Sequence, residues 1–580
     1  MTFPSGRFGA LFLGLAGASV AVSGALADTG AIFDTLDRIH PVWAQNGMVS
    51  AQEHLAAAIG RDIMAKGGNA VDAGVAVAFA LAVTLPRAGN IGGGGFMLVH
   101  DAKTGQTHAI DYREMAPAGA SRDMFLNEAG EPDSDKSLYS GASSGVPGTV
   151  AGMKLALDKY GTMEWADVIA PAIKLAEEGF TVTPELADSI EAERQYLTKY
   201  PATTRIFFKE DGTVWKPGET LVQADLAKTL KKIAAEGPDG FYKGEVAEAI
   251  SKAVQADGGL ITPEDMAAYK VMEREPVKGT YRGYDIVSMP PPSSGGVHLI
   301  QILNALEGYP IGALGQNSAE TIHLMAETMK LAYADRSEYL GDPDFVDVPV
   351  AALTSKEYAA DMRDKISADF ARPAAQIAPA DLAPYESDQT THFSVVDKDG
   401  NAVSNTYTIN FNYGSGLVAD GTGVLMNNEM DDFSAKPGTP NGFGLIGGDA
   451  NAIQAGKRPL SSMTPTIVLK DGKVWLVTGS PGGARIITTV LQVVMNMIDH
   501  GMNVAEASTA PRVHHQWLPD ELRVEEGLSL DTIRLLQAKG HSIALKDAMG
   551  STQSIMRDPA TGALYGASDP RRPDAATLGY

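Results

Sequence analysis

The 580-residue chain contains no cysteine. Disulfides, thiol nucleophiles and cysteine-ligated zinc are therefore excluded for it. Basic residues are also few beside acidic ones, since 47 Lys and Arg stand against 71 Asp and Glu and give a formal net charge of −24. Binding to nucleic acid or to an anionic membrane needs clustered basic side chains, so we expect neither as a partner.

The chain also lacks a convincing membrane span after residues 8–22, which are themselves apolar and rich in Ala, Gly and Leu. About fifteen apolar residues are short for a membrane span. Ala25-Leu26-Ala27 then supplies a small-x-small cleavage pattern. We therefore expect residues 1–27 to be a signal peptide cleaved near Ala27-Asp28. The mature protein is expected to be periplasmic or secreted, without stable membrane insertion. An uncleaved N-terminal anchor is the alternative.

The remaining composition, 44% hydrophobic and 20% charged, is that of a globular protein large enough for several layers. Residues 51–85 predict two helices that are interrupted at residues 67–69. The first begins near Ser50, and the second is apolar nearly all round, which predicts burial. The four glycines at 92–95 precede a strand and are not followed by Gly-Lys-Ser/Thr. Close backbone packing explains them better than a phosphate cradle does.

Residues 390–410 are the most distinctive stretch, because they predict two alternating strands joined by a turn. A three-residue turn at 398–400 pairs even-numbered residues with even-numbered ones and gives Gly400 a left-handed position. Thr390 then lies opposite Thr408 and close to Asn410. A row of hydroxyls on one strand face is either a solvated surface or a functional site.

Thr390 is a candidate nucleophile, but a hydroxyl needs a base. No Ser-x-x-Lys or Gly-x-Ser-x-Gly pattern supplies one. The α-amine of Thr390 itself, with an ordinary pKa near about 8, would serve if Thr390 began a chain. That requires a cut between Gln389 and Thr390, which follows an Ala- and Pro-rich stretch at 371–385 predicted to be an exposed loop. Attack of the Thr390 hydroxyl on the Gln389 carbonyl is our hypothesis for this cut, with Thr408 orienting the hydroxyl.

Other polar positions have open interpretations. Arg113 follows a strand and suits either a structural ion pair or a substrate carboxylate. The acidic cluster at 429–432 suits a divalent metal, an ammonium group or turn capping. Gly482-Gly483 precedes a predicted helix at 486–498 and offers free N–H groups to an anion or oxyanion. His514-His515 lacks the i, i+4 spacing of a helical metal pair and is interpreted as structural.

Several motifs, taken together and in order, resemble the gamma-glutamyltransferase family over essentially the whole mature chain. They are Gly67-Gly68-Asn69-Ala70-Val71-Asp72-Ala73, residues 92–96, Pro292-Ser293-Ser294-Gly295-Gly296, residues 389–396, Asn428-Glu429-Met430-Asp431-Asp432-Phe433, residues 458–463 and residues 479–485.

The resemblance implies an N-terminal-nucleophile hydrolase, an α+β protein with a four-layer αββα sandwich. The precursor would cut itself into a large subunit (28–389) and a small subunit (390–580) that form one core. The implied substrates are glutathione and other γ-glutamyl compounds, with amino-acid or peptide acceptors, and no cofactor or metal is needed.

The resemblance also assigns roles to the candidate residues. Thr390 is the nucleophile that forms a γ-glutamyl ester, and Thr408 is its hydrogen-bond partner. Gly482 and Gly483 provide the oxyanion hole. The α-carboxylate of the glutamyl group is assigned to Arg113, Ser461 and Ser462, and its α-amine to Asn410, Glu429 and Asp432.

Two positions depart from the family pattern. Bacterial members often carry Gln where this chain has Glu429, although an acid still suits an ammonium group. The Gly- and Pro-rich loop at 437–448, predicted to be mobile with little to pack, resembles the family's lid. Phe443 stands there where a tyrosine phenol is common. The alternatives are a related acylase, such as a cephalosporin acylase or a polyglutamate depolymerase, and an exported amino-acid-binding protein without chemistry.

Overall fold

The computed structural model describes residues 38–377 and 390–580, and Ile39–Tyr580 form one compact unit. The predicted signal peptide, the second part of the predicted exposed loop and Gln389 lie outside the described residues. Among the helices of the described part, none is long and apolar enough to cross a membrane.

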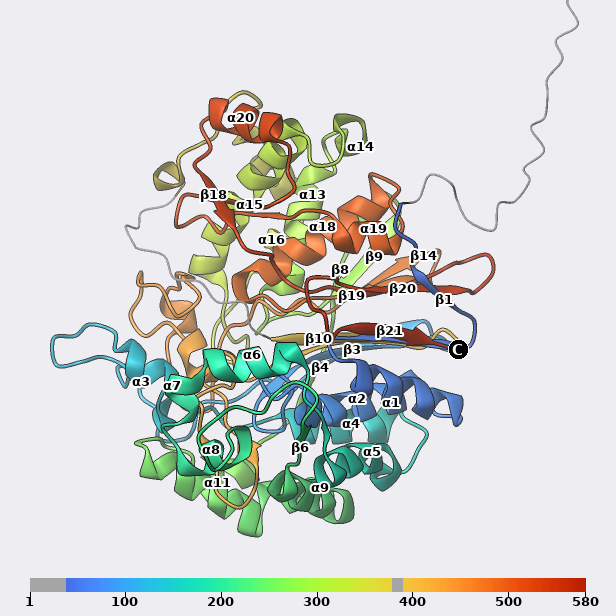
Figure 1. Cartoon of the computed structure of the whole chain (residues 1–580). Coiled ribbons are helices and arrows are strands. Elements are labelled where there is room, and N and C mark those ends of the chain that lie inside the picture. Colours follow the sequence, from blue (N-terminus) through green and yellow to red (C-terminus); the bar gives the residue numbers. More distant parts are fainter. Residues whose placement is uncertain (1–37, 378–389) are drawn as a thin grey trace, which may run out of the picture. The chain divides into compact units, whose positions relative to one another are not determined.

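Two seven-stranded antiparallel sheets form the centre of this unit (Figure 1). The first has the order β21 (Ala576–Gly579), β2 (Gly47–Ala51), β10 (Thr391–Asp397), β11 (Ala402–Thr408), β3 (Gly94–Asp101), β4 (Gln106–Asp111), β7 (Met272–Arg274). The second has the order β1 (Val42–Ala44), β20 (Leu564–Ser568), β19 (Gln553–Arg557), β15 (Lys473–Thr478), β14 (Thr466–Lys470), β9 (Tyr284–Ser288), β8 (Val277–Tyr281).

Helices cover the outer face of each sheet (Figure 1). Those on the first sheet include α1 (His54–Ala65), α2 (Ala70–Thr84) and α4 (Thr149–Tyr160), and those on the second include α13 (Gly295–Leu306), α15 (Ala319–Tyr339), α18 (Ile486–Ile498) and α19 (Val504–Thr509). The predicted four-layer αββα sandwich is confirmed.

The N-terminal helices were predicted correctly except for their start. Every residue of α2 is buried, and Asn69 caps it in a capping box with Asp72. The first helix begins at His54 behind the cap Glu53, whereas Ser50 belongs to the fully buried strand β2. The predicted start near Ser50 is therefore wrong, because the periodicity of a short buried stretch does not distinguish a strand from a helix.

The hairpin of β10 and β11 has the predicted register, since Thr391 pairs with Tyr407 and Val396 with Ala402. Gly400 has a φ of 90°, as a left-handed turn position requires. Both strand faces are buried, so the interpretation as a solvated face is wrong. The polar face instead meets the second sheet: Ser394 Oγ donates to the Gln553 carbonyl at 2.8 Å and Ser404 Oγ to the Thr478 carbonyl at 3.0 Å.

The glycine-rich segment before β3 packs against the end of this hairpin. A Cβ on Gly93 would lie 2.1 Å from the Thr408 carbonyl oxygen, so only glycine fits. Asn90 Nδ2 also donates to that oxygen at 2.9 Å, and Asn90 Oδ1 accepts from the Gly93 N–H at 2.9 Å. The predicted role in close packing is confirmed, and its effect is to fix the strand end that carries Thr408.

Candidate active site

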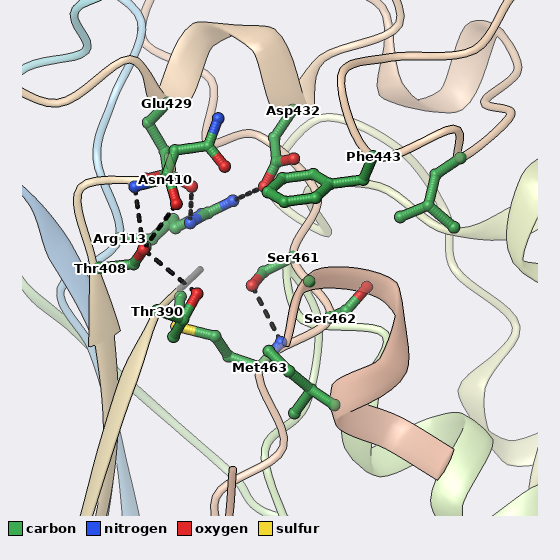
Figure 2. Close-up of a pocket in the computed structure, with 13 residues that line it drawn as sticks. Arg113, Thr390, Thr408, Asn410, Glu429, Asp432, Phe443, Ser461, Ser462 and Met463 are labelled. Atoms are coloured by element: carbon green, nitrogen blue, oxygen red, sulfur yellow. Dashed lines mark hydrogen bonds and ion pairs between the residues drawn. The ribbon is translucent and has the colours of Figure 1, made fainter. Parts of the chain in front are cut away.

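The two predicted threonines meet at one end of the hairpin. Thr390 directly precedes β10 and Thr408 ends β11, and Thr390 Oγ1 donates to Thr408 Oγ1 at 3.2 Å (Figure 2). The Asn410 N–H donates to Thr408 Oγ1 at 2.9 Å and thereby fixes that hydroxyl. Thr390 has a φ of 120°, a value that β-branched residues avoid. The candidate nucleophile is thus held by one neighbour and strained in its backbone.

A small cavity opens beside Thr390. Most of the residues singled out in the sequence line it together: Arg113, Thr390, Thr408, Asn410, Glu429, Asp432, Ser461, Ser462 and Gly483. Gly482, the neighbour of Gly483 in the sequence, does not line the cavity. Phe443, Leu445, Met463 and Ile486 supply the apolar part of the wall.

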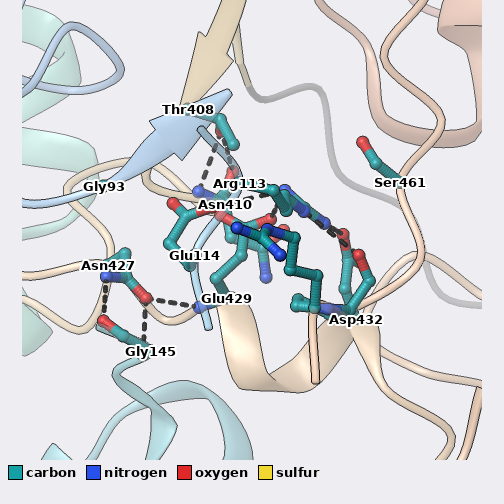
Figure 3. Close-up of polar contacts among 12 residues, drawn as sticks. Gly93, Arg113, Glu114, Gly145, Thr408, Asn410, Asn427, Glu429, Asp432 and Ser461 are labelled. Atoms are coloured by element: carbon teal, nitrogen blue, oxygen red, sulfur yellow. Dashed lines mark hydrogen bonds and ion pairs between the residues drawn. The ribbon is translucent and has the colours of Figure 1, made fainter. Parts of the chain in front are cut away.

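Arg113 is buried and paired with acidic side chains on both arms of its guanidinium (Figure 3). Nη1 forms an ion pair with Glu429, Nη2 lies 2.5 Å from Asp432 Oδ2, and Nε donates to the Pro459 carbonyl at 3.2 Å. A guanidinium and two carboxyl groups thus lie side by side in the wall of the cavity. This pattern is complementary to a zwitterionic amino-acid head group, which carries one charge of each sign.

Glu114 was missed by the sequence reasoning. Its side chain is buried, its carboxylate oxygens have no hydrogen-bond partner among the described residues, and Arg113 Nη1 lies 3.8 Å away. Burial raises the pKa of the Glu114 carboxyl to about 7, although Arg113 lowers it. Burial likewise raises the pKa of Glu429 well above its usual range. The two carboxyls therefore retain a proton more readily than exposed glutamates do.

Ser461 and Ser462 are held by the Pro-Ser-Ser-Gly-Gly segment ahead of α13. The Ser294 N–H donates to the Ser461 carbonyl at 2.8 Å, and Ser293 Oγ donates to the Met463 carbonyl at 2.6 Å. Two motifs far apart in the sequence thus form one support. Arg336 of α15 joins them, and no local pattern in the sequence marked this residue as part of the site.

The start of the helix after β15 faces the loop interpreted as a lid. A Cβ on Gly483 would lie 2.6 Å from the Phe443 ring, and Gly483 has a φ of 53°. Phe443 is buried and stacks on Phe411, with ring centroids 4.8 Å apart at 23°. Leu445 is buried as well, so the expectation of a loop with little to pack is wrong. The missing phenol is replaced by apolar packing over the cavity (Figure 2).

One group of described side chains has the composition of a metal site, namely His323, Glu327 and His541. Lys330 Nζ lies 2.5 Å from Glu327 Oε1, and the two histidine rings hydrogen-bond to each other at 2.8 Å. Because an ammonium already neutralises the carboxylate, we interpret the group as a structural network. His514 also has protein partners, in Thr488 Oγ1 at 2.8 Å and Gln516 Oε1 at 3.0 Å.

Comparison with known proteins gives consistent matches. The family model described as gamma-glutamyltranspeptidase matches residues 56–579. The glutathione hydrolase proenzyme of Escherichia coli (strain K12) is 62% identical over 545 residues, which cover 94% of this chain and 93% of that protein. The crystal structure of cephalosporin acylase from Bacillus halodurans matches with a TM-score of 0.81 and 30% identity over 95% of this chain and 99% of that chain.

The crystal structure of Helicobacter pylori gamma-glutamyltranspeptidase matches with a TM-score of 0.55 and 49% identity, covering 56% of this chain and 93% of that chain. These matches agree with the resemblance seen in the motifs and with the layers of the fold. The chain belongs to the gamma-glutamyltranspeptidase family.

Proposed function

We propose that this protein is a self-processing γ-glutamyltransferase and glutathione hydrolase with Thr390 as its nucleophile. The hydrogen bond between Thr390 Oγ1 and Thr408 Oγ1, at the edge of a cavity matched to a zwitterion, carries this proposal. The name of the relative from Escherichia coli, glutathione hydrolase proenzyme, supports both the substrate and the processing.

In the processing step, the Thr390 hydroxyl attacks the Gln389 carbonyl carbon. The peptide C–N bond breaks as the C–O ester bond forms, and the hydroxyl proton ends on the new α-amine. Water then hydrolyses the ester and leaves a large subunit (28–389) and a small subunit (390–580). The unfavourable φ of Thr390 supports this step, because cleavage of the peptide bond releases its strain.

In the catalytic step, the Thr390 α-amine accepts the hydroxyl proton and the oxygen attacks the γ-carbonyl of the substrate. The Gly482 and Gly483 N–H groups precede a helix and would stabilise the tetrahedral oxyanion. The leaving amine takes the proton, and a γ-glutamyl ester remains on Thr390. Water releases glutamate from this ester, or the amine of an amino-acid or peptide acceptor takes the γ-glutamyl group.

Substrate recognition would use the charges already paired in the cavity. The α-carboxylate would bind Arg113, Ser461 and Ser462, while the α-ammonium would bind Asn410, Glu429 and Asp432. Because Arg113 is already paired with Glu429 and Asp432 in the free site, an incoming zwitterion exchanges partners with these groups and adds no net charge. A substrate with only one of the two charges would leave a buried group unpaired.

A related acylase is the second candidate, and the match to a cephalosporin acylase structure is the observation in its favour. Such an enzyme, or a polyglutamate depolymerase, would share the nucleophile. The charged lining of the cavity favours an α-amino-acid head group instead. For localisation we propose export, with residues 1–27 as signal peptide and a periplasmic or secreted mature protein.

The decisive experiment compares Thr390→Ala with the wild-type protein by mass and N-terminal sequence. We expect two wild-type chains, the smaller beginning at Thr390, and one uncut chain for the variant. Thr391→Val is the matched control, because Thr391 is the adjacent buried threonine and its hydroxyl has no described partner. Cleavage of Thr390→Ala, or a wild type that releases no glutamate from glutathione, would contradict the proposal.

A further inference from the structure

Arg336 is a buried cation beside the serines of the cavity. Its side chain extends from α15, with only 5% of the residue exposed. Nε donates to Ser294 Oγ at 3.0 Å and Nη2 donates to Ser462 Oγ at 3.2 Å. Among the described residues, no carboxylate comes within 4.0 Å of this guanidinium.

A buried guanidinium without an ion-pair partner is costly, because its hydration is lost and nothing of opposite charge replaces it. Burial accordingly lowers the pKa of Arg336, although Tyr333 and Asp432 raise it. Arg113 differs, since it has direct carboxylate partners on both arms. Arg113, in the wall of the cavity, is therefore compensated by carboxylates of the protein, whereas Arg336, next to the cavity, is not.

The direction of the hydrogen bonds shows what Arg336 does to Ser462. A guanidinium can only donate, so Ser462 Oγ accepts from it and the serine O–H proton stays available for another acceptor. Ser461 is prepared in the same way, because its Oγ accepts from the Met463 N–H at 3.1 Å. Both hydroxyls are thus set to donate to an anion in the cavity.

We propose that Arg336 is a positioning residue that determines specificity for the α-carboxylate of the substrate. It orients the Ser462 hydroxyl toward that carboxylate. It also supplies a positive charge that the bound carboxylate compensates. The inference rests on the proposed function, since it assigns the carboxylate end of the γ-glutamyl group to Ser461 and Ser462. Arg336 itself does not line the cavity and touches no reacting atom.

The test is a set of three anilides cleaved by the processed enzyme: γ-glutamyl, 4-aminobutanoyl, which lacks only the α-carboxylate, and glutaryl, which lacks only the α-amine. For Arg336→Gln we expect KM for the γ-glutamyl anilide to rise about tenfold or more, with kcat changed less than about threefold. The glutaryl anilide should lose a similar factor. The slow reaction of the 4-aminobutanoyl anilide should be unchanged, because it has no carboxylate to bind.

Two further variants separate positioning from general stability. Arg336→Lys keeps the charge and loses the planar fork, so it should restore part of the lost affinity. Arg512→Gln removes another buried arginine, one paired with Asp569 away from the cavity, and should affect all substrates alike. Equal losses on all three anilides for Arg336→Gln would overturn the inference. If Arg336→Gln does not fold, Arg336→Lys becomes the test. The inference would then be overturned if Arg336→Lys preferred the γ-glutamyl anilide over the 4-aminobutanoyl anilide as strongly as the wild type does. A wild type inactive on every anilide would instead refute the proposed function.

Discussion

Arg113 is surrounded by three acids, the buried Glu114 and Glu429 and the partly buried Asp432. One guanidinium cannot compensate three carboxylates in a dry environment, so at least one carboxyl is stabilised in its protonated form. Burial raises the pKa values of Glu114 and Glu429, and repulsion from the neighbouring carboxylates raises them further. The sequence identified Arg113 and the acidic cluster through their motifs. It did not identify Glu114 or Arg336, because their importance depends on what surrounds them in three dimensions.

This balance predicts a pH dependence for Glu114→Gln. The pKa of Glu114 is about 7 in the folded protein and near its ordinary value of 4.5 in the unfolded chain. The folded state therefore binds the proton more tightly, and the stability from this group, full below pH 4.5, is lost as the pH rises through about 7. Gln resembles the protonated form and removes this loss. We expect the melting temperature of the variant to rise relative to wild type between pH 5 and pH 8.

Glu191→Gln is the control for that experiment, because Arg194 lowers the pKa of this exposed carboxyl and no gain at high pH follows. A melting-temperature difference between Glu114→Gln and wild type that stays constant from pH 5 to pH 8 would refute the assigned protonation.

At the scale of elements, the sequence predicted the strand register of the β10–β11 hairpin but not the burial of its polar face. Pairing parity and Gly400 fix which residues face each other, and this is local information. That the polar face is buried depends on the second sheet, whose strands come from distant parts of the chain, so the alternation allowed a solvated face equally well. The sequence likewise did not predict the environment of the loop at 437–448. Its Gly and Pro residues predict an irregular segment, but the stacking of Phe443 on Phe411 depends on the tertiary fold.

The lid packing leads to a prediction for Phe443→Ala. Removing the ring opens the space above Gly483 and Phe411, and water reaches the acyl-enzyme more easily. We expect the share of hydrolysis over transfer to glycylglycine to increase severalfold, and KM for the donor to rise. The measurement is the ratio of free glutamate to γ-glutamyl-glycylglycine. Phe443→Tyr keeps the stack and should resemble wild type, and Phe345→Ala, at an exposed phenylalanine, should change nothing. An unchanged product ratio in Phe443→Ala would exclude a closing role for the ring.

At the scale of the whole molecule, each of the two large sheets mixes strands that precede Thr390 in the sequence with strands that follow it. In the first sheet, β10 and β11 lie between β2 and β3, although β2 and β3 precede the proposed cut and β10 and β11 follow it. In the second, four consecutive strands from after the cut lie between β1 and β9 from before it. The family motifs made the layered fold predictable. This interleaving of strands was not, since strand order in a sheet is set by tertiary packing.

The interleaving predicts how the two proposed subunits behave after cleavage. Separating them would break the backbone hydrogen bonds of β2 with β10 and of β3 with β11, and would expose the core on both sides of each sheet. We therefore expect the cleaved chains to elute together in native size-exclusion chromatography, to separate only in denaturant, and to unfold in a single thermal transition. The uncut Thr390→Ala protein is the control and should elute at the same position. Two native peaks, or a small chain that melts separately from the large one, would contradict the shared core, because neither set of strands completes a sheet on its own.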